Sequence, residues 1–452
     1  MQYFIGLDIG TTSISATVIN EESHSQVESF TIPYHYPVAC REQDFSQQDA
    51  SLILAESYSL LDRILAKYPA IQVIGLTGQM HGILYVDQDG LAVSPLMNWQ
   101  DKRAERIWDG QQTYCGRIQE LSGEKIAAGY GLATHFYNIQ NGLVPQEAHS
   151  FCSIMDYVGM QLTGRKSPLM HTSVAASFGL FDHIDKSFKT PVLDALGMTD
   201  LLLPEITEDF CLCGHYKGIP VAVAIGDNQA SFLGSMKDIE GSVLVNIGTG
   251  SQISAVTTRA TSPEALEIRP LVKNRNIICG SALCGGASYA LLETFFRAYA
   301  AASGTSAISQ YDTMNRLAYE TYHAHKTPLA VNTYFRGQRH NPASTGSILG
   351  ITTENFTPGQ LILGFLYGMC RELYDLLKEE LPAKKTIVAS GNAIQRIAIL
   401  KHILEEMFGL PVLISGASEE AALGAALFGA AAAGFLQSER EFGAFIHYKY
   451  AE

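Results

Sequence analysis

The sequence predicts an α/β fold of two domains, each built on a mixed β-sheet, that face one another across a cleft. With 452 residues, the chain is too long for one ordinary core and suggests two domains of about 200 residues each. Hydrophobic residues make up 47% of it and charged residues only 17%, so it can bury large cores. A strand–turn–strand pattern also occurs twice, once at the head of each half of the chain.

The composition argues against several classes of protein. A formal net charge of −14 is unlike that of a nucleic-acid-binding protein, which normally carries a basic patch. The eight cysteines form no regular framework, as expected for free thiols in a reducing cytoplasm. Among them, the cluster of Cys211, Cys213 and His215 lacks a fourth metal ligand at standard spacing, which favours a structural role. The N-terminus has no signal-peptide pattern, and the longest apolar run, 421–436, is too short to span a bilayer. We therefore expect a soluble cytoplasmic protein.

The repeated pattern predicts two β-hairpins. In the first, an apolar strand ends on Asp8, residues 10–12 (Gly-Thr-Thr) form a turn, and the alternating segment 13–19 forms the second strand. Segment 242–256 has the same order, and Asn246 stands where the first hairpin has Asp8. Two such hairpins indicate an internal duplication. The boundary then falls between 236 and 240, giving an N-terminal domain over 1–236 and a C-terminal domain over 237–452.

The rest of each half predicts further strands and helices from apolar periodicity and from capping residues. These are a strand over 219–225, a helix over 229–236, a helix opened by Thr357 and Pro358 that runs to Glu380, a helix over 395–408 that stops at Gly409, a strand over 411–415, and an alanine-rich interior helix capped by Ser418.

The two Gly-Thr turns are candidate phosphate-binding sites. Glycine lets the backbone approach a ligand closely, and threonine hydroxyls and successive N–H groups can hold phosphate oxygens. Most such turns are merely tight hairpins, but the duplication and the flanking acid favour a function here. The chain has no Gly-Lys dipeptide, which excludes a Walker-type loop, and no dinucleotide-binding fingerprint.

Asp227 is the candidate catalytic base. It follows the strand predicted over 219–225, and α/β proteins bind ligands at the carboxyl ends of their strands. A Gly-Asp-Asn turn is commonly just a helix cap. A carboxylate at this position could instead accept the proton of an attacking hydroxyl, as phosphoryl transfer requires.

A dense polar and aromatic group follows two other predicted strands. A histidine is more often structural than functional, and a tryptophan more often packs than stacks on a sugar. A polyol pocket nevertheless needs this mixture, because each hydroxyl that enters a dry site must be paired. The members of the group are Gln79, His81, Trp99, Gln100, Asp101 and Arg103.

These segments together resemble the FGGY carbohydrate kinases, which belong with actin and the heat-shock ATPases to one superfamily. The resemblance covers essentially the whole chain and implies two actin-like (ribonuclease H-like) domains, ATP and Mg²⁺ as cofactors, and phosphorylation of a small sugar. The blocks that carry it, in order, are GLDIGTTS, EQD (42–44), TGQMHG, NWQDKR, GDNQAS, NIGTGS, CGGA (284–287), FRGQR (335–339), SGNA and EEAALGAA.

The resemblance implies roles for individual residues. Asp8 and Asp227 match the acids near the metal, and Asp227 also matches the catalytic base. Sugar contacts are expected from Gln79, Met80, His81, Trp99, Asp101 and Asn228, and phosphate or nucleotide contacts from Thr11, Thr12, Gly248, Thr249, Gly285, Gly286, Gly391 and Asn392. The pair Gly391-Asn392 departs from the family's usual Gly-Gly, and His171 stands where the family often has Asp, so we assign His171 no role.

The expected reaction is phosphorylation of a ketose at its terminal hydroxyl. The pair Met80-His81 resembles xylulose and sedoheptulose kinases and departs from the Arg-Glu of glycerol kinases. Segments 129–138 and 98–101 favour sedoheptulose, phosphorylated at O7, with D-xylulose, phosphorylated at O5, as the alternative. A non-catalytic nucleotide- or sugar-binding module is the alternative from another class, which an intact Asp227 disfavours. The expected partner is a small ketose, with no nucleic acid and no membrane; a homodimer stays open.

Overall fold

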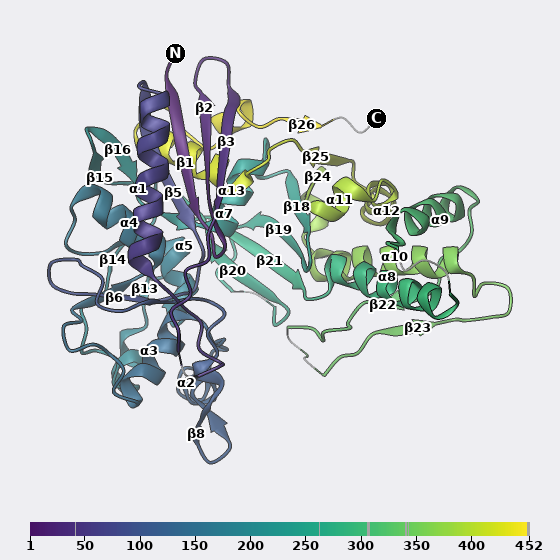
Figure 1. Cartoon of the computed structure of the whole chain (residues 1–452), viewed down its shortest axis with the longest axis horizontal. Helices are drawn as coiled ribbons and strands as arrows, with labels where there is room; N and C mark the ends of the chain where they lie inside the picture. The colour runs from purple at the N-terminus through teal and green to yellow at the C-terminus, as the bar shows by residue number, and fades with distance from the viewer. Residues whose placement is uncertain (41, 262, 305–307, 340, 342, 450–452) are drawn as a thin grey trace. The chain divides into compact units, whose positions relative to one another are not determined.

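The computed structural model describes all residues except 41, 262, 305–307, 340, 342 and 450–452 (Figure 1). The chain forms two compact units. Unit 1 comprises residues 1–237, 269–276 and 417–446, and unit 2 comprises residues 238–268, 277–416 and the chain from His447. The first passage from unit 1 to unit 2 falls at Lys237, but the sequence patterns do not anticipate the two later returns to unit 1. The division into functional domains at 236/237 stays a prediction.

Unit 1 is built on a mixed seven-stranded sheet in the order β15-β16-β5-β1-β2-β3, with β17 also paired to β5. The hairpin β1–β2 is antiparallel, and β5 runs parallel to β1. The central strands β1 and β5 are buried along nearly their whole length, which explains why their sequences are almost continuously apolar. The strands are β1 (Tyr3–Ile9), β2 (Ser13–Asn20), β3 (Ser25–Pro33), β5 (Ile71–Gly78), β15 (Leu212–Tyr216), β16 (Ile219–Ala222) and β17 (Ile225–Gly226).

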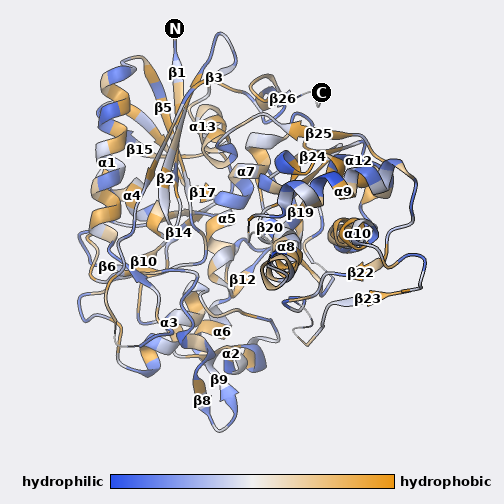
Figure 2. Cartoon of the chain, turned by 45° about the vertical axis from the view of Figure 1, so that its right-hand side comes forward, coloured by the Kyte–Doolittle hydropathy of each residue, from blue (hydrophilic) through white to orange (hydrophobic). Residues whose placement is uncertain are grey.

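Helices cover both faces of this sheet (Figure 2). On one face, α13 packs against β1 and β5 so closely that a Cβ atom on Gly6 or Gly75 would lie 1.8 Å from a carbonyl oxygen of the helix. This contact confirms that the alanine-rich segment is an interior helix, although its N-cap is Glu419 and not Ser418. The helices of unit 1 are α1 (Ala50–Lys67), α2 (Tyr114–Ser122), α3 (Gly131–Gln140), α4 (Ile154–Thr163), α5 (Thr172–Ala175), α6 (Thr190–Ala195), α7 (Asp227–Ser235) and α13 (Glu420–Ala432).

Unit 2 repeats this plan with a second seven-stranded sheet in the order β20-β21-β19-β18-β24-β25-β26. Its hairpin β18–β19 is antiparallel and β24 runs parallel to β18, as β5 does to β1 in unit 1. The strands are β18 (Ser242–Ile247), β19 (Ser251–Thr257), β20 (Leu266–Pro270), β21 (Asn276–Ala282), β24 (Thr386–Ser390), β25 (Val412–Ser415) and β26 (Tyr448–Lys449). The helices are α8 (Gly285–Ala302), α9 (Tyr311–His323), α10 (Pro358–Leu377), α11 (Asn392–Arg396) and α12 (Ile399–Phe408).

The two sheets confirm the predicted α/β fold, both hairpins and the helix opened by Thr357 and Pro358, which ends at Leu377. Two expected elements are each split in the structure. The strand over 219–225 breaks into β16 and β17, and the helix over 395–408 is interrupted at Ile397, whose backbone is not helical and whose side chain is buried in the core of unit 2.

The remaining strands form short pairs, and the described residues also form four 3-10 helices, η1 (Arg103–Glu105), η2 (Ala176–Phe178), η3 (Leu381–Ala383) and η4 (Glu441–Ala444). The strand pairs in unit 1 are β4 (Gln47–Gln48) with β7 (Leu96–Met97), β6 (Leu84–Val86) with β10 (Ser150–Cys152), β8 (Ile107–Asp109) with β9 (Gln112–Thr113), β11 (Leu169–His171) with β14 (Glu205–Thr207), and β12 (Phe181–Asp182) with β13 (Ser187–Phe188). In unit 2, β22 (Ala330–Asn332) pairs with β23 (Ser347–Leu349). All eight cysteines are free thiols. Across the described residues, no helix is long and apolar enough to cross a membrane.

Candidate active site

Asp8 and Asp227 are brought together by the strand order of unit 1. Asp8 lies near the carboxyl end of β1 beside Thr77 of β5, and Thr77 in turn lies beside Ile225 of β17. The Thr77 hydroxyl donates to the Ile225 carbonyl oxygen at 2.8 Å, which ties β17 to β5. Asp227 follows β17 as the first residue of α7. Both acids therefore lie at the edge of the sheet where α/β proteins bind ligands.

One oxygen of the Asp8 carboxyl, Oδ1, is buried and has no hydrogen-bond partner among the described residues. Burial, and after it the negative charges of Asp227 and Glu419, raise the pKa of Asp8 to about 7. A cation bound to such an unpaired carboxylate oxygen would offset its lost hydration and its repulsion by the neighbouring carboxylates.

These residues fit Mg²⁺, which proteins usually bind through one or two carboxylates together with the phosphates of a substrate. Asp8 would hold the ion, with Asp227 next to it. In the described part of the chain, no group of three or more His, Cys, Asp or Glu side chains is placed to hold a metal ion by itself. A magnesium ion here would accordingly complete its coordination with water and with oxygen atoms of a bound nucleotide.

The Asp227 carboxyl lies in a mixed environment. Burial raises its pKa, while the charge of Arg269 and the N–H of Asn228 lower it. The N-terminus of α7 also favours a carboxylate at this position. A raised pKa makes a carboxylate a stronger base, which suits Asp227 to accept a proton from a hydroxyl.

Segment 171–177, to which the sequence analysis assigns no role, supports both Asp227 and the predicted sugar loop. The Ser173 Oγ atom accepts a hydrogen bond from the N–H of Gly226, at 3.1 Å, directly before Asp227. His171 is fully buried, and its Nδ1 atom accepts from the N–H of Ser173 at 3.1 Å. The Ser177 Oγ atom accepts from the N–H of His81 at 3.1 Å. Buried hydroxyls in a short apolar segment are the sequence signal for such a role, since buried polar groups need partners.

Met80 and His81 form a constrained loop after β5. His81 has a positive φ of 73°, which non-glycine residues rarely adopt and which occurs often at functional sites. Its Nδ1 atom lies 2.8 Å from the Ser177 carbonyl oxygen, and its ring stacks on Tyr130 with centroids 4.4 Å apart. Met80 is buried against Gly226, where a Cβ atom would lie 2.7 Å from the methionine sulfur. The predicted sugar loop therefore packs against the residue directly before Asp227.

Gln79 and Trp99, both predicted to bind sugar, contact the first Gly-Thr turn. The Trp99 indole Nε1 donates to the Thr11 hydroxyl at 2.9 Å, while the Trp99 side chain remains 47% exposed. The Thr11 hydroxyl donates in turn to Gln79 Oε1 at 3.3 Å. Thr12 is exposed, and Asn228 lies partly exposed beside Asp227. The structure therefore links the predicted sugar wall to the predicted phosphate turn.

Asp101 is fully buried, and both of its oxygens are used. They accept hydrogen bonds from the Arg103 Nε and Nη2 atoms, both at 2.8 Å, and from the N–H of Ser46 at 2.9 Å. Arg103 is also buried and donates to Asn138 Oδ1 at 2.7 Å. A direct sugar contact of Asp101 stays a prediction, and these contacts give it a structural role that its position after Trp99 did not suggest.

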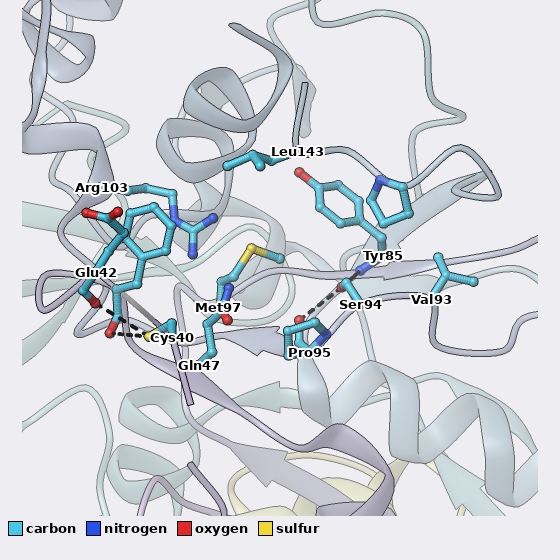
Figure 3. A pocket seen from close by; sticks show the side chains of 12 residues that line it. Cys40, Glu42, Gln47, Tyr85, Val93, Ser94, Pro95, Met97, Arg103 and Leu143 are labelled. Atoms are coloured by element: carbon cyan, nitrogen blue, oxygen red, sulfur yellow. Dashed lines mark hydrogen bonds between the residues drawn. The ribbon is translucent and has the colours of Figure 1, made fainter. Parts of the chain in front are cut away.

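A cavity of about 310 Å³ lies next to this buried ion pair. Arg103, Tyr85 and Met97 belong to its wall, and Cys40 and Leu143 are also among its lining residues (Figure 3). Of the polar and aromatic group predicted to form a polyol pocket, Arg103 lines this cavity and the other members do not. Asp8 and Asp227 do not line it either, so the cavity is distinct from the site around these two acids.

In unit 2, the predicted nucleotide residues gather around the second Gly-Thr turn. The carbonyl oxygens of Gly248 and Thr249 accept hydrogen bonds from the first amides of α8, those of Gly286 and Ala287, at 2.8 and 2.9 Å. A Cβ atom on Gly285 would lie 1.9 Å from Ser251 Oγ, so only glycine permits this approach. The Gly286 N–H is thus used by the turn. Nucleotide contacts of Gly285 and Gly286 stay a prediction.

Gly391 and Asn392 lie on the neighbouring strand end. Gly391 has a positive φ of 93°, and a Cβ atom there would lie 2.6 Å from the carbonyl oxygen of Ile247, one residue before the turn. Asn392 begins α11, and Asn246 donates to Ser390 Oγ at 3.0 Å. Of the two positions, Gly391 is the one whose backbone requires glycine, and glycine is present there. The difference from the family's Gly-Gly pair therefore lies at Asn392.

Comparison with known proteins identifies the family. Residues 3–234 match the N-terminal domain, and residues 244–433 the C-terminal domain, of the FGGY family of carbohydrate kinases. The chain belongs to this family. It is an enzyme that transfers a phosphoryl group to a sugar, and ATP is the donor that the family implies.

Individual relatives differ in the sugar that their names give. The sedoheptulokinases of Mus musculus and Homo sapiens are 26% and 27% identical to the chain, over 94% of it and 96% of their own length. The xylulose kinase of Staphylococcus xylosus is 24% identical over 87% of the chain and 83% of its own length.

Solved structures share the fold. A gluconate kinase from Lactobacillus acidophilus has a TM-score of 0.83 at 18% identity, covering 99% of this chain and 93% of that one. The Plasmodium falciparum glycerol kinase with ADP has a TM-score of 0.82 at 17% identity, covering 98% and 92%. These likenesses confirm two actin-like domains with mixed sheets.

Proposed function

We propose that the enzyme phosphorylates sedoheptulose at its terminal hydroxyl, with ATP and Mg²⁺, to give sedoheptulose 7-phosphate. The observation that carries the chemistry is the placement of Asp8 and Asp227 at the ends of β1 and β17, the two strands that pair with the carboxyl end of β5, where the charge of Asp227 contributes to the raised pKa of Asp8. An acceptor hydroxyl needs a base, and a triphosphate needs a cation. The two carboxylates supply one site for each.

In this proposal, Asp227 accepts the proton of the attacking hydroxyl, and Asn228 and the His81 loop orient the sugar. Mg²⁺, when bound at Asp8 and beside Asp227, supplies positive charge to the transferring phosphoryl group. The two Gly-Thr turns hold phosphate oxygens through Thr11, Thr12, Gly248 and Thr249, and Gly391 and Asn392 contact the nucleotide. Most of the acceleration comes from positioning and electrostatics, because phosphoryl transfer requires little covalent chemistry of the protein.

Two relatives named as sedoheptulokinases that match nearly the whole chain support sedoheptulose as the acceptor. Xylulose is the second candidate, supported by the match to a xylulose kinase over most of the chain. The two ketoses differ mainly in length, and one or two carbons change binding by only about 1–3 kcal/mol. The choice between them therefore needs a direct measurement.

The test of the chemistry is a comparison of the wild type with Asp227→Asn, measured as ATP turnover against a panel of ketoses. Loss of the base should lower kcat by about 10²- to 10⁴-fold, while sugar binding measured by calorimetry should change little. Full turnover in the variant would reject Asp227 as the base.

For the substrate, kcat/KM should be compared between sedoheptulose and D-xylulose in the wild-type enzyme, with glycerol as the negative control. We expect sedoheptulose to be preferred. A higher kcat/KM for D-xylulose would make the enzyme a xylulokinase and leave the assignment of Asp227 intact.

A further inference from the structure

The carbonyl groups of the first Gly-Thr turn all point toward buried donors. The Gly10 carbonyl oxygen accepts from the Tyr34 hydroxyl and, at 3.3 Å, from Gln79 Nε2. The Thr11 carbonyl oxygen accepts from Gln48 Nε2 at 2.8 Å. Gln79 Nε2 also donates to Gln48 Oε1 at 3.0 Å, and the Tyr34 hydroxyl interacts with both glutamines. Tyr34, Gln48 and Gln79 therefore form one connected cluster, which we call the carbonyl anchor.

The carbonyl anchor fixes the direction of the turn's amides. In a trans peptide, the C=O of one residue and the N–H of the next point in opposite directions. Because the Gly10 and Thr11 carbonyls face the anchor, the N–H groups of Thr11 and Thr12 face away from it. Neither N–H donates to any protein group within the described residues, and Thr12 is exposed. The turn thus presents two successive free amides on one side, which is the arrangement that binds anionic oxygens.

The second turn reaches the same arrangement by another route. There, the Gly248 and Thr249 carbonyls accept from the backbone amides that begin α8. The N–H groups of Thr249 and Gly250 consequently point away from the helix. The first turn is followed by a strand and not by a helix whose amides bond to it. There, the side chains of Tyr34, Gln48 and Gln79 donate to the turn's carbonyl oxygens in place of helix amides. The same outcome in both halves indicates that the amide direction matters for function and is not an accident of one loop.

We propose that Tyr34, Gln48 and Gln79 are positioning residues that aim the Thr11 and Thr12 amides at the terminal phosphoryl group of ATP. This assignment rests on the proposed function, in which the first turn lies on the same unit as Asp8 and Asp227. The predicted sugar loop, the proposed base Asp227 and the proposed metal-binding Asp8 all belong to unit 1. We therefore assign the free amides of the first turn to the terminal phosphoryl group, which is transferred to the sugar. The amides of the second turn, in unit 2, are assigned to the phosphates that remain on the nucleotide.

The experiment uses Tyr34→Phe and Gln48→Met in the full chain, since both keep the shape of the side chain and remove the donor. We expect each variant to lower kcat by about tenfold or more and to weaken binding of β,γ-imido-ATP by a similar factor. Binding of ADP, which lacks the terminal group, and the KM for the sugar should stay within about twofold of the wild type. Nucleotide affinities are to be measured by titration calorimetry with Mg²⁺ present.

Matched controls lie next to the anchor. Tyr36 stacks on Tyr34 with ring centroids 5.2 Å apart and donates to Glu56 at 3.1 Å, so Tyr36→Phe removes a tyrosyl hydrogen bond that does not reach the turn. Gln47 precedes Gln48 but borders the cavity beside Arg103, so Gln47→Met is the control for the amide. Both controls should keep wild-type kcat and wild-type binding of the two nucleotides.

Three results would overturn the assignment: unchanged kcat in Tyr34→Phe and Gln48→Met, equal weakening of ADP and β,γ-imido-ATP, or the same losses in the controls. If Gln48→Met fails to fold, Tyr34→Phe decides, because phenylalanine preserves the ring packing. A failure of the proposed function would show differently, as absence of turnover with every ketose in the wild type.

Discussion

Two buried carboxyl groups show that a raised pKa does not by itself mark an active site. Asp8 and Asp156 both have a pKa of about 7, mainly because burial disfavours the charged form. Asp8 faces two further carboxylates at a strand end, whereas Asp156 lies in the capping box of α4, where its Oδ2 atom accepts from the Ser153 hydroxyl at 2.7 Å. The neighbouring charges, and not the pKa shift alone, distinguish the candidate metal-binding carboxyl of Asp8 from the structural carboxyl of Asp156.

Asp156 gives a pH prediction that is independent of catalysis. Its folded-state pKa of about 7 exceeds the ordinary value of 3.8, so the folded state binds the proton more tightly than the unfolded state. The resulting stabilisation is full below about pH 4 and is lost as the pH rises toward 7. The free energy of unfolding of the wild type should therefore fall relative to Asp156→Asn, by up to about 4 kcal/mol over this range. Urea unfolding of both proteins at several pH values measures this difference. The same pH dependence of the free energy of unfolding in both proteins would contradict the prediction.

The strand-end positions of the candidate site residues could be predicted from the sequence, but their hydrogen-bond and ion-pair partners could not. Asp8 and Asp227 could be predicted because strand ends and duplicated turns are local patterns. The buried ion pair of Asp101 with Arg103 is held by two distant residues, Ser46 and Asn138. The use of the Gly286 amide likewise depends on how α8 meets a turn about 40 residues earlier. Such pairings are set by three-dimensional packing and leave no periodicity in the chain.

At the scale of elements, α13 determines how unit 1 is packed. Its small residues allow the helix backbone to touch β1, β5 and α7, where Gly234 and Gly424 meet. Apolar composition correctly indicated a helix buried on all sides, since an all-round apolar helix has no solvent face. It could not indicate which sheet buries it. The broken helix after Asn392 is a similar case, because the burial of Ile397 overrides the local helical pattern.

Gly75→Ala tests the contact between α13 and the sheet. A Cβ atom would lie 1.8 Å from the Ala425 carbonyl oxygen, and backbone atoms on both sides cannot move aside easily. We expect a loss of at least about 2 kcal/mol in the free energy of unfolding, measured by urea titration. As a control, Gly116→Ala in α2 meets only side-chain atoms at 3.2 and 3.3 Å and should change stability by less than about 1 kcal/mol. Equal effects of the two substitutions would contradict the packing argument.

At the scale of the whole molecule, unit 1 is discontinuous in sequence. The chain leaves it at Lys237, returns briefly with residues 269–276, and returns again with residues 417–446, which include α13. The two α/β domains and their hairpins could be predicted from the duplication. The return could not, because nothing in a linear pattern records which of two similar sheets a late helix covers.

A fragment of residues 1–237 should therefore lack a cooperative thermal transition, because the faces of β1 and β5 that α13 covers would be exposed. Joining residues 417–446 to this fragment through a flexible linker should restore the transition, measured by circular dichroism. The same fusion with Gly424→Val, whose Cβ would lie 1.8 Å from the Ala230 carbonyl oxygen, should fail. A cooperative transition in the fragment alone would show that α13 is dispensable.

The late position of α13 also sets the order in which the protein matures on the ribosome. Strands β1 and β5 emerge early, yet the helix that buries Gly6 and Gly75 is translated only after most of unit 2. At a translation rate of about 5–20 residues per second, many seconds pass between synthesis of β5 and synthesis of α13. The apolar face of the nascent sheet remains exposed for that time. During this interval it is open to chaperones and to proteases. A message truncated before codon 417 would thus leave unit 1 without α13, even though it encodes every strand of that unit's sheet.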